Sequence, residues 1–142
     1  MFASVYMTYD KWMASLCLWR EARGSNTNAL IGIYWVLKNR LASSGFGKSL
    51  PEIVLEPKQF TSFSAGDPNS LKFPIPDGSA DWTAWRTCQD VVDGFFEIAD
   101  VDPTNGAVFY ESLPERPTTG WWSTLEMTVQ IGPFRFYKEK AT

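Results

Sequence analysis

The chain has 142 residues, which suits a single domain that buries a hydrophobic core without metal or disulfide support. Its formal net charge is −3 and it has no Lys/Arg-rich stripe, which speaks against nucleic acid as a partner. Histidine is absent, which excludes imidazole-dependent triads and leaves only poor options for zinc. We therefore expect no metal and no cofactor, and a chemistry based on carboxylates, hydroxyls and amides.

The first predicted helix runs from Thr8 or Tyr9 to Ala22, and Gly24 ends it. Thr8 or Asp10 can cap its first turn. Its apolar side chains recur at helical spacing, and they are Trp12, Met13, Leu16 and Cys17. No stretch of transmembrane length follows, so we expect no membrane span.

The second predicted helix begins after an asparagine cap, either Asn26 or Asn28, and stops in the segment SSGFG. Its predicted buried face consists of Leu30, Ile33, Tyr34, Leu37 and Leu41. In the segment SLPEIVL, Ser49 and Glu52 form a capping-box pattern that opens a short third helix. Pro57 ends this helix.

Residues 59–79 are rich in Ser, Gly, Pro, Asp and Asn, which predicts a long ordered loop or a floppy insertion. A fourth helix is predicted over residues 80–99, with an apolar stripe of Trp85, Cys88, Val92, Phe95 and Phe96. The extended segments AVFY, LEMTVQI and FRFY follow, and Gly132 and Pro133 join the last two. Helices followed by a small antiparallel sheet predict an α+β fold, in one domain spanning residues 1–142.

Cys17 and Cys88 both fall in helical patterns, so we expect buried free thiols, although a bridge between the two helices is compatible with the sequence. The chain has seven tryptophans, and for any one of them core packing is favoured over ligand stacking. Of the neighbours Trp121 and Trp122, we expect one to pack inward and the other to border a groove.

The segment WREARGS places Glu21 between Arg20 and Arg23 in the last turn of the first helix. A carboxylate there faces the negative end of the helix dipole, and desolvation by tryptophan would disfavour its ionisation further. A carboxylic acid that keeps its proton near neutral pH is what glycosidic cleavage needs to protonate the leaving oxygen. The alternative is an ordinary surface ion pair with the two arginines. The local sequence leaves both interpretations open.

Five segments occur in the order LCLWREARG, ALIGIYWVLKNRL, EIVLEPKQFTSF, DPTNGAVFY and IGPFRFY. Together they resemble the cell-wall hydrolase family typified by the spore-cortex lytic enzyme SleB, from about residue 16 to residue 138. The resemblance implies a lysozyme-like, transglycosylase-related α+β fold. It also implies cleavage of peptidoglycan glycan strands between N-acetylmuramic acid and N-acetylglucosamine, with one essential glutamate that falls on Glu21.

The same resemblance implies which residues bind the substrate, with Thr61 standing where the family usually has serine. Hydrogen bonds to sugars are expected from Gln59, Thr104 and Tyr110, and stacking faces from Phe60 and from Trp82 or Trp85, of which Trp85 is favoured as core. Asn39 and Arg40 match a pair of the family's second helix that we expect to be structural. The predicted substrate-binding set is Gln59, Phe60, Thr61, Trp82, Thr104, Asn105 and Tyr110.

Two departures from the family pattern leave an inactive relative as an alternative. Ser25 stands where the family commonly has an acidic residue, and Phe134 stands where it commonly has histidine. Such a relative would bind peptidoglycan without cleaving it.

The resemblance implies a lytic transglycosylase, in which Glu21 acts first as acid and then as base and a 1,6-anhydro sugar is formed. A muramidase, which releases reducing ends, would instead need a second carboxylate nearby. Asp102 is the candidate, but DPTNG also reads as a turn in which Asp102 accepts backbone amides, and we favour that role.

We expect the protein to act as a monomer on peptidoglycan glycan strands at the bacterial cell wall. Its N-terminal segment has no basic region, and Asp10 and Lys11 interrupt the apolar run, so no signal peptide is predicted. A phage lysin, released through a holin or carried in a virion, would reach the wall without one. The acidic balance gives no long-range attraction to an anionic wall, so recognition should depend on the binding groove.

Overall fold

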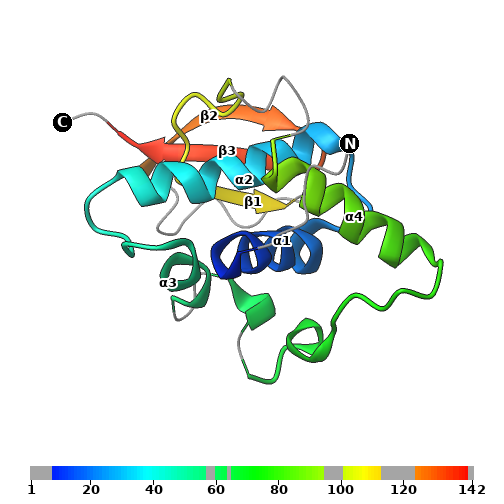
Figure 1. Ribbon diagram of the computed structural model, residues 1–142. Helices are drawn as coiled ribbons and strands as arrows, with labels where there is room; N and C mark the ends of the chain where they lie inside the picture. The colour runs from blue at the N-terminus through cyan, green and yellow to red at the C-terminus, as the bar shows by residue number, and fades with distance from the viewer. Residues whose placement is uncertain (1–7, 57–59, 64, 95–100, 113–123, 141–142) are drawn as a thin grey trace.

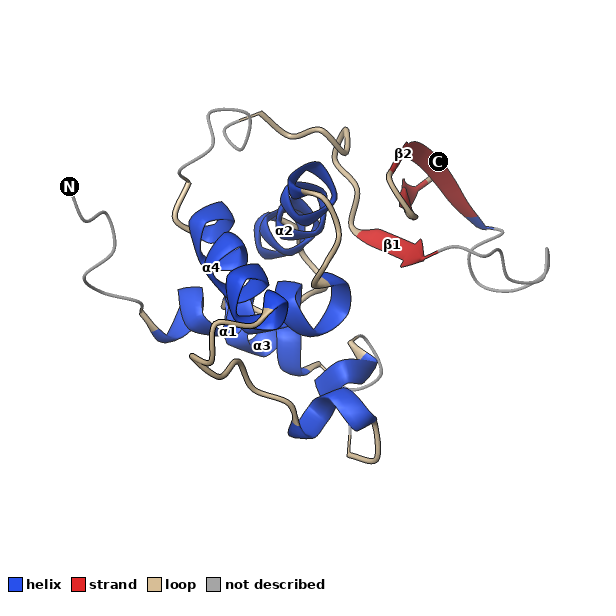
Figure 2. Cartoon of the chain, turned by 90° about the vertical axis from the view of Figure 1, so that its right-hand side faces the viewer, coloured by secondary structure: helices blue, strands red, loops and turns tan. Residues whose placement is uncertain are grey.

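The computed structural model describes residues 8–56, 60–63, 65–94, 101–112 and 124–140. Its helices are α1 (Tyr9–Ala22), α2 (Thr27–Ala42), α3 (Leu50–Leu55) and α4 (Ala80–Val92), and the 3-10 turns η1 (Thr61–Phe63) and η2 (Pro68–Leu71) lie between α3 and α4 (Figure 1). The strands β1 (Phe109–Ser112), β2 (Leu125–Ile131) and β3 (Phe134–Glu139) follow. Figure 2 shows the helices gathered on one side and the strands on the other. The predicted α+β layout is confirmed.

The helices begin at the predicted caps because each capping side chain accepts a backbone N–H that the helix leaves unpaired. Thr8 accepts from the amide of Lys11, and Asn26 accepts from the amide of Ala29. Ser49 caps α3 in the same way. The chain leaves α1 through Gly24, whose φ of +89° is a conformation that side chains with a Cβ rarely adopt. None of the described helices is long and apolar enough to cross a membrane.

Helix α1 lies at the centre of the helical lobe and packs against α2, α3 and α4 (Figure 1). Trp85 of α4 is buried and its ring meets that of Trp12 edge-on at 6.3 Å, so its predicted core role is confirmed. Cys17 and Cys88 are buried free thiols, and burial raises the pKa of Cys88 to about 12. The fully buried aliphatic side chains include Leu16, Leu18, Leu30, Ile33 and Leu37.

The sheet is antiparallel with the strand order β1-β3-β2, and its hairpin turns at Gly132 as predicted. It docks on the helical lobe where Phe136 of β3 approaches Gly32 of α2. A Cβ at Gly32 would lie 2.8 Å from Cζ of Phe136, a side chain with no exposed surface. The absence of a side chain at Gly32 is therefore what lets the strand lie this close to the helix.

The structure corrects the predicted ends of two elements. Helix α4 ends at Val92 rather than at residue 99, because Gly94 adopts a φ of +77° and its amide bonds back to the carbonyl of Val91. Leu41 is 41% exposed rather than buried, since it lies in the last turn of α2 beyond the core. Several other predicted positions lie outside the described residues, and they are Phe95, Phe96, Trp121 and Trp122.

Candidate active site

Glu21 lies in the last turn of α1, and its side chain is half-buried. The hydroxyl of Tyr110, from β1, donates a hydrogen bond of 2.8 Å to Oε1 of Glu21. Among the described residues, no other side chain hydrogen-bonds Glu21. One carboxylate oxygen is thus held in place, whereas Oε2 accepts no hydrogen bond from a described side chain.

The arginines on either side of Glu21 do not pair with it in the described part of the chain. Arg20 is 6% exposed and donates to the carbonyl oxygens of Ser62, Ser70 and Lys72 at 3.4, 3.2 and 3.1 Å. Arg23 donates to the carbonyl of Trp19 and lies 3.5 Å from the carboxylate of Asp81. The surface ion-pair interpretation of WREARGS is therefore wrong.

Arg20 holds the segment that we call the strap, which consists of residues 62–63 and 65–79. Besides its three carbonyl contacts, its guanidinium lies 4.6 Å from the ring centre of Phe63 and 4.8 Å from that of Phe73. The strap contains the last two residues of η1 and all of η2, and it runs below α1 in the view of Figure 1. Of the two predictions for this region, the ordered loop is the one that the structure supports.

Tyr110 is enclosed by aromatic rings that fix its position. The rings of Phe134, Phe136 and Phe60 lie 5.7, 6.1 and 6.3 Å from that of Tyr110. Burial raises the pKa of Tyr110 well above its usual value, and the charge of Glu21 and the hydrogen bond to it raise that pKa further. The hydroxyl therefore remains a hydrogen-bond donor at neutral and alkaline pH.

Helix α2 holds the loop that leads into β1. Asn39 donates to Oδ2 of Asp102 and to the carbonyl of Ala107, at 3.0 and 2.9 Å. Arg40, which is buried, donates to the carbonyl of Val108 at 2.7 Å. The structural role predicted for Asn39 and Arg40 is confirmed, and through this loop they set the position of Tyr110.

Asp102 is saturated by its own turn. Its carboxylate accepts hydrogen bonds from the amide and hydroxyl of Thr104, the amide of Gly106 and the side chain of Asn39. Burial alone would raise the pKa of Asp102, but these hydrogen bonds outweigh it and hold the pKa below its usual value. The predicted turn role is confirmed by these contacts.

The structure brings only part of the predicted substrate-binding set to Glu21. Thr104 has no exposed surface and its hydroxyl is engaged within the turn, which corrects the expectation that it contacts a sugar. Phe60 is 2% exposed and supports Tyr110, so its ring offers no face for stacking. Asn105 is exposed at the tip of the turn, with a φ of 56°.

The remaining predicted residues are less informative about the site. Trp82 is partly buried against the core on α4, and no described contact joins it to Glu21. Thr61 begins η1, and Gln59 lies outside the described residues. The roles predicted for these residues stay predictions.

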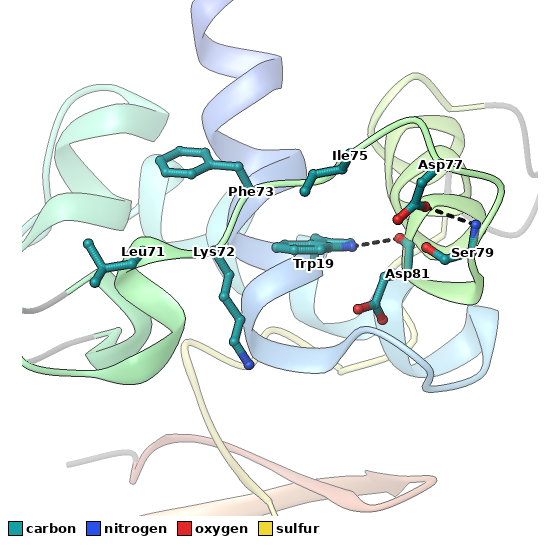
Figure 3. Close-up of a pocket in the computed structure, with 8 residues that line it drawn as sticks. All are labelled: Trp19, Leu71, Lys72, Phe73, Ile75, Asp77, Ser79 and Asp81. Atoms are coloured by element: carbon teal, nitrogen blue, oxygen red, sulfur yellow. Dashed lines mark hydrogen bonds between the residues drawn. The ribbon is translucent and has the colours of Figure 1, made fainter.

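A pocket of about 300 Å³ opens beside the end of α1, between the strap and the start of α4 (Figure 3). Trp19 of α1 forms its inner wall, and Glu21 is not among its lining residues. The other lining residues are Leu71, Lys72, Phe73, Ile75, Asp77, Ser79 and Asp81.

Comparison with known proteins decides the family. The family model described as Cell Wall Hydrolase matches residues 24–137, which is most of the chain. The chain belongs to the cell wall hydrolase family. The family model begins at Gly24, directly after the turn that carries Glu21, so it does not itself include the candidate acid.

Two solved structures share the fold of this cell wall hydrolase. The catalytic domain of the germination-specific lytic transglycosylase SleB from Bacillus anthracis is 25% identical, with a TM-score of 0.68 over 95% of this chain and 98% of that domain. The catalytic domain of the Bacillus cereus SleB protein is 24% identical, with a TM-score of 0.68 over 95% of this chain and 94% of that one. The fold is therefore that of a SleB catalytic domain, as the resemblance implied.

Full-length relatives are named spore cortex-lytic enzymes. The protein from Oceanobacillus iheyensis is 26% identical over 137 residues, covering 94% of this chain and 43% of that protein. The protein from Halalkalibacterium halodurans is 29% identical over 119 residues, covering 83% of this chain and 32% of that protein. This cell wall hydrolase chain thus spans less than half the length of these relatives.

Sequence reasoning missed two features of the site. It assigned Tyr110 to the substrate, whereas the hydroxyl of Tyr110 bonds to Glu21. It left open an ion pair of Glu21 with Arg20 and Arg23, whereas Arg20 holds the strap. Spacing could have indicated that Arg20 does not pair with Glu21, because adjacent positions of a helix do not face each other.

Proposed function

We propose that this protein cleaves the glycan strands of peptidoglycan as a lytic transglycosylase, with Glu21 as the catalytic residue. The observation that carries the proposal is the half-buried Glu21, which is hydrogen-bonded by Tyr110 and paired with no described arginine. A carboxyl group in such surroundings can exchange a proton with a ligand instead of serving as a permanent partner of a cation. The family and the fold of lytic-enzyme domains support the same chemistry.

In the proposed mechanism, Glu21 donates its proton to the oxygen that bridges N-acetylmuramic acid and N-acetylglucosamine. The bond between that oxygen and C1 of the muramyl residue breaks, and an oxocarbenium-like centre develops at C1. Glu21, now ionised, accepts the proton of the muramyl C6 hydroxyl while its oxygen bonds to C1. The product is a 1,6-anhydro end, and no water is consumed. Because Tyr110 holds Oε1, we assign both proton transfers to Oε2.

The engagement of Asp102 favours this reaction over hydrolysis by a carboxylate pair. A muramidase of that type needs a second carboxylate about 5–9.5 Å from the first. Asp102 accepts four hydrogen bonds within its own turn and from Asn39, so it is committed to the fold. One carboxyl group with two successive roles is the simpler assignment.

The test compares wild type with Glu21→Gln on purified peptidoglycan, with products identified by mass spectrometry. We expect wild type to release anhydromuropeptides and Glu21→Gln to be slower by about 10²–10⁴-fold, the usual contribution of a general acid–base group. Glu126→Gln, at an exposed position of β2, is the matched control and should retain full activity.

The other outcomes separate the alternatives. Undiminished activity of Glu21→Gln excludes the acid role. Reducing ends, which are one water heavier than anhydro ends, identify a muramidase. If wild type co-sediments with the wall and releases nothing, the protein is an inactive relative. Phe134, which replaces the histidine common in the family, contacts the ring of Tyr110 and would then be the first position to examine.

The cell wall is the proposed site of action. The relatives carry the names of spore cortex enzymes, so release as a phage lysin stays a prediction from the sequence.

A further inference from the structure

The pocket beside Trp19 has an apolar wall and rim that the proposed mechanism does not use. Leu71, Phe73 and Ile75 line it and are 85%, 52% and 64% exposed. The indole N–H of Trp19 donates to the carbonyl of Asp81 at 2.9 Å, so the wall presents carbon rather than a free donor (Figure 3). Exposed apolar side chains gathered around one hollow are typical of a binding site.

Opposite charges stand at the two sides of this pocket. Figure 3 shows Lys72 on one side of Trp19, and Asp77 and Asp81 on the other. Lys72 forms no ion pair with a described residue, whereas Asp81 is partly neutralised by Arg23 at 3.5 Å. Asp77 is exposed, and hydrogen bonds from Ser79 lower its pKa, so it is ionised at neutral pH. A ligand that carries both an anionic and a cationic group matches this arrangement.

Hydrogen bonds within the protein hold the walls of the pocket in place. Arg20 binds the carbonyls of Ser70 and Lys72, which fixes the strap against α1. At the other end, Ser79 caps α4 by accepting the amide of Trp82, and Asp77 accepts the amide of Ser79. A preformed site loses little conformational entropy when it binds, so even a short ligand can be held.

The pocket lies away from the proposed acid. Trp19 and Glu21 are two positions apart on α1, which directs them about 200° apart around the helix axis. A group bound against Trp19 therefore lies away from the bond that Glu21 is proposed to cut. It would belong to another part of the same substrate.

We propose that this pocket binds the peptide that peptidoglycan glycan strands carry, with a peptide carboxylate at Lys72 and a peptide ammonium group at Asp77. The inference rests on the proposed function, because it takes peptidoglycan as the substrate. The neutral sugar rings of the strand cannot form ion pairs with Lys72 and Asp77. The peptides of the strand can, because they combine small apolar residues with acidic and diamino residues. Leu71, Phe73 and Ile75 supply the contact for the apolar part.

The test titrates synthetic N-acetyl-L-Ala-γ-D-Glu-L-Lys into the Glu21→Gln protein, with NMR chemical shifts as the readout. We expect saturable binding that weakens about tenfold in Asp77→Asn and in Lys72→Met, as when one charge-assisted hydrogen bond is lost. Ile75→Ser should weaken it less, and Glu139→Gln, which removes an exposed charge at the end of β3, should leave it unchanged. Acetylation of the lysine amine removes the ammonium group that is proposed to bind Asp77. The acetylated peptide should therefore bind the Glu21→Gln protein and its Asp77→Asn derivative with the same, weaker affinity.

The proposal is overturned if the peptide does not bind saturably, or if Asp77→Asn and Lys72→Met leave its affinity unchanged. The result is independent of cleavage, since the titrated protein already lacks the proposed acid. Loss of peptide binding with normal release of anhydro ends by wild type would remove the pocket assignment alone. Saturable binding without any glycan cleavage by wild type would remove the proposed function alone.

Discussion

The hydroxyl of Tyr110 lies 2.8 Å from Oε1 of Glu21, although 89 positions of sequence separate the two residues. Tyr110→Phe removes this hydrogen bond and keeps the ring that packs on Phe134. We expect glycan cleavage to slow by about 10- to 100-fold, because a hydrogen bond to a charged group contributes about 1.5–3 kcal/mol. Initial rates of anhydromuropeptide release measure the effect.

Tyr34→Phe is the control for Tyr110→Phe. Tyr34 is half-buried on α2, and its ring, which faces the ammonium group of Lys38, is kept in phenylalanine. Its activity should match wild type. Equal rates for Tyr110→Phe and Tyr34→Phe would show that the hydroxyl does not position the acid.

Arg20→Met should loosen the strap. The substitution keeps much of the side-chain volume and removes the donors to three strap carbonyls. We expect a loss of about 2–4 kcal/mol in the free energy of unfolding, since one buried and two partly buried carbonyl acceptors lose their partner. Urea denaturation gives the free energy, and limited proteolysis should cut within residues 65–79. Arg86→Met, at an exposed position of α4, should change neither, and a strap that resists protease in Arg20→Met would contradict its assigned role.

Asp102→Asn should destabilise the protein in a pH-dependent manner. Hydrogen bonds hold the pKa of Asp102 below its unfolded value of about 3.9, so its stabilisation is fully present above that pH. It is lost as the pH falls through the lower, folded pKa. At pH 7 we expect a cost of about 1–3 kcal/mol, because an amide cannot accept from all the donors that face the carboxylate.

Urea denaturation at neutral pH and in acid measures this dependence. The difference between wild type and Asp102→Asn should shrink as the pH falls from about 3.9 through the lower, folded pKa. Asp90→Asn, on α4, controls for loss of one negative charge. A difference that stays constant into strong acid would contradict the ionised turn.

Gly32→Ala should destabilise the contact between α2 and the sheet. Alanine favours a helix by about 1 kcal/mol over glycine. Its Cβ, however, would lie 2.8 Å from Cζ of Phe136 and 3.3 Å from Cδ1 of Ile131, and overpacking of this kind costs about 1–3 kcal/mol. The difference between the two effects leaves a net loss of up to about 2 kcal/mol in the free energy of unfolding, measured by urea denaturation. In a Phe136→Leu background the same substitution should be neutral or stabilising, and an equal loss in both backgrounds would exclude the clash.

The sequence predicted most of the helices and strands because their signals are local. Thr8, Asn26 and Ser49 bond to amides three positions away, so capping is visible in a short segment. The hairpin at Gly132 is also local, because it joins two strands that are adjacent in sequence. The end of α4 was overestimated because the apolar pattern continues past Gly94, and only the backbone conformation there stops the helix.

The candidate site was less predictable because its contacts are distant in sequence. Arg20 bonds to carbonyls 42 to 52 positions away, which no local pattern indicates. The sequence motifs predicted which residues belong to the site but not the directions of their side chains. Thr104 and Phe60 belong to matched motifs and are buried, whereas the hydroxyl of Tyr110 reaches Glu21.

Because the partners Glu21 and Tyr110 come from opposite ends of the fold, the order of synthesis has a consequence for activity. A nascent chain that has been made only as far as α4 contains Glu21, the proposed acid, but lacks the Tyr110 hydroxyl that bonds to it. Under the proposed function, glycan cleavage should therefore begin only after β1 has packed against the helices, so that cleavage reports that the fold is complete.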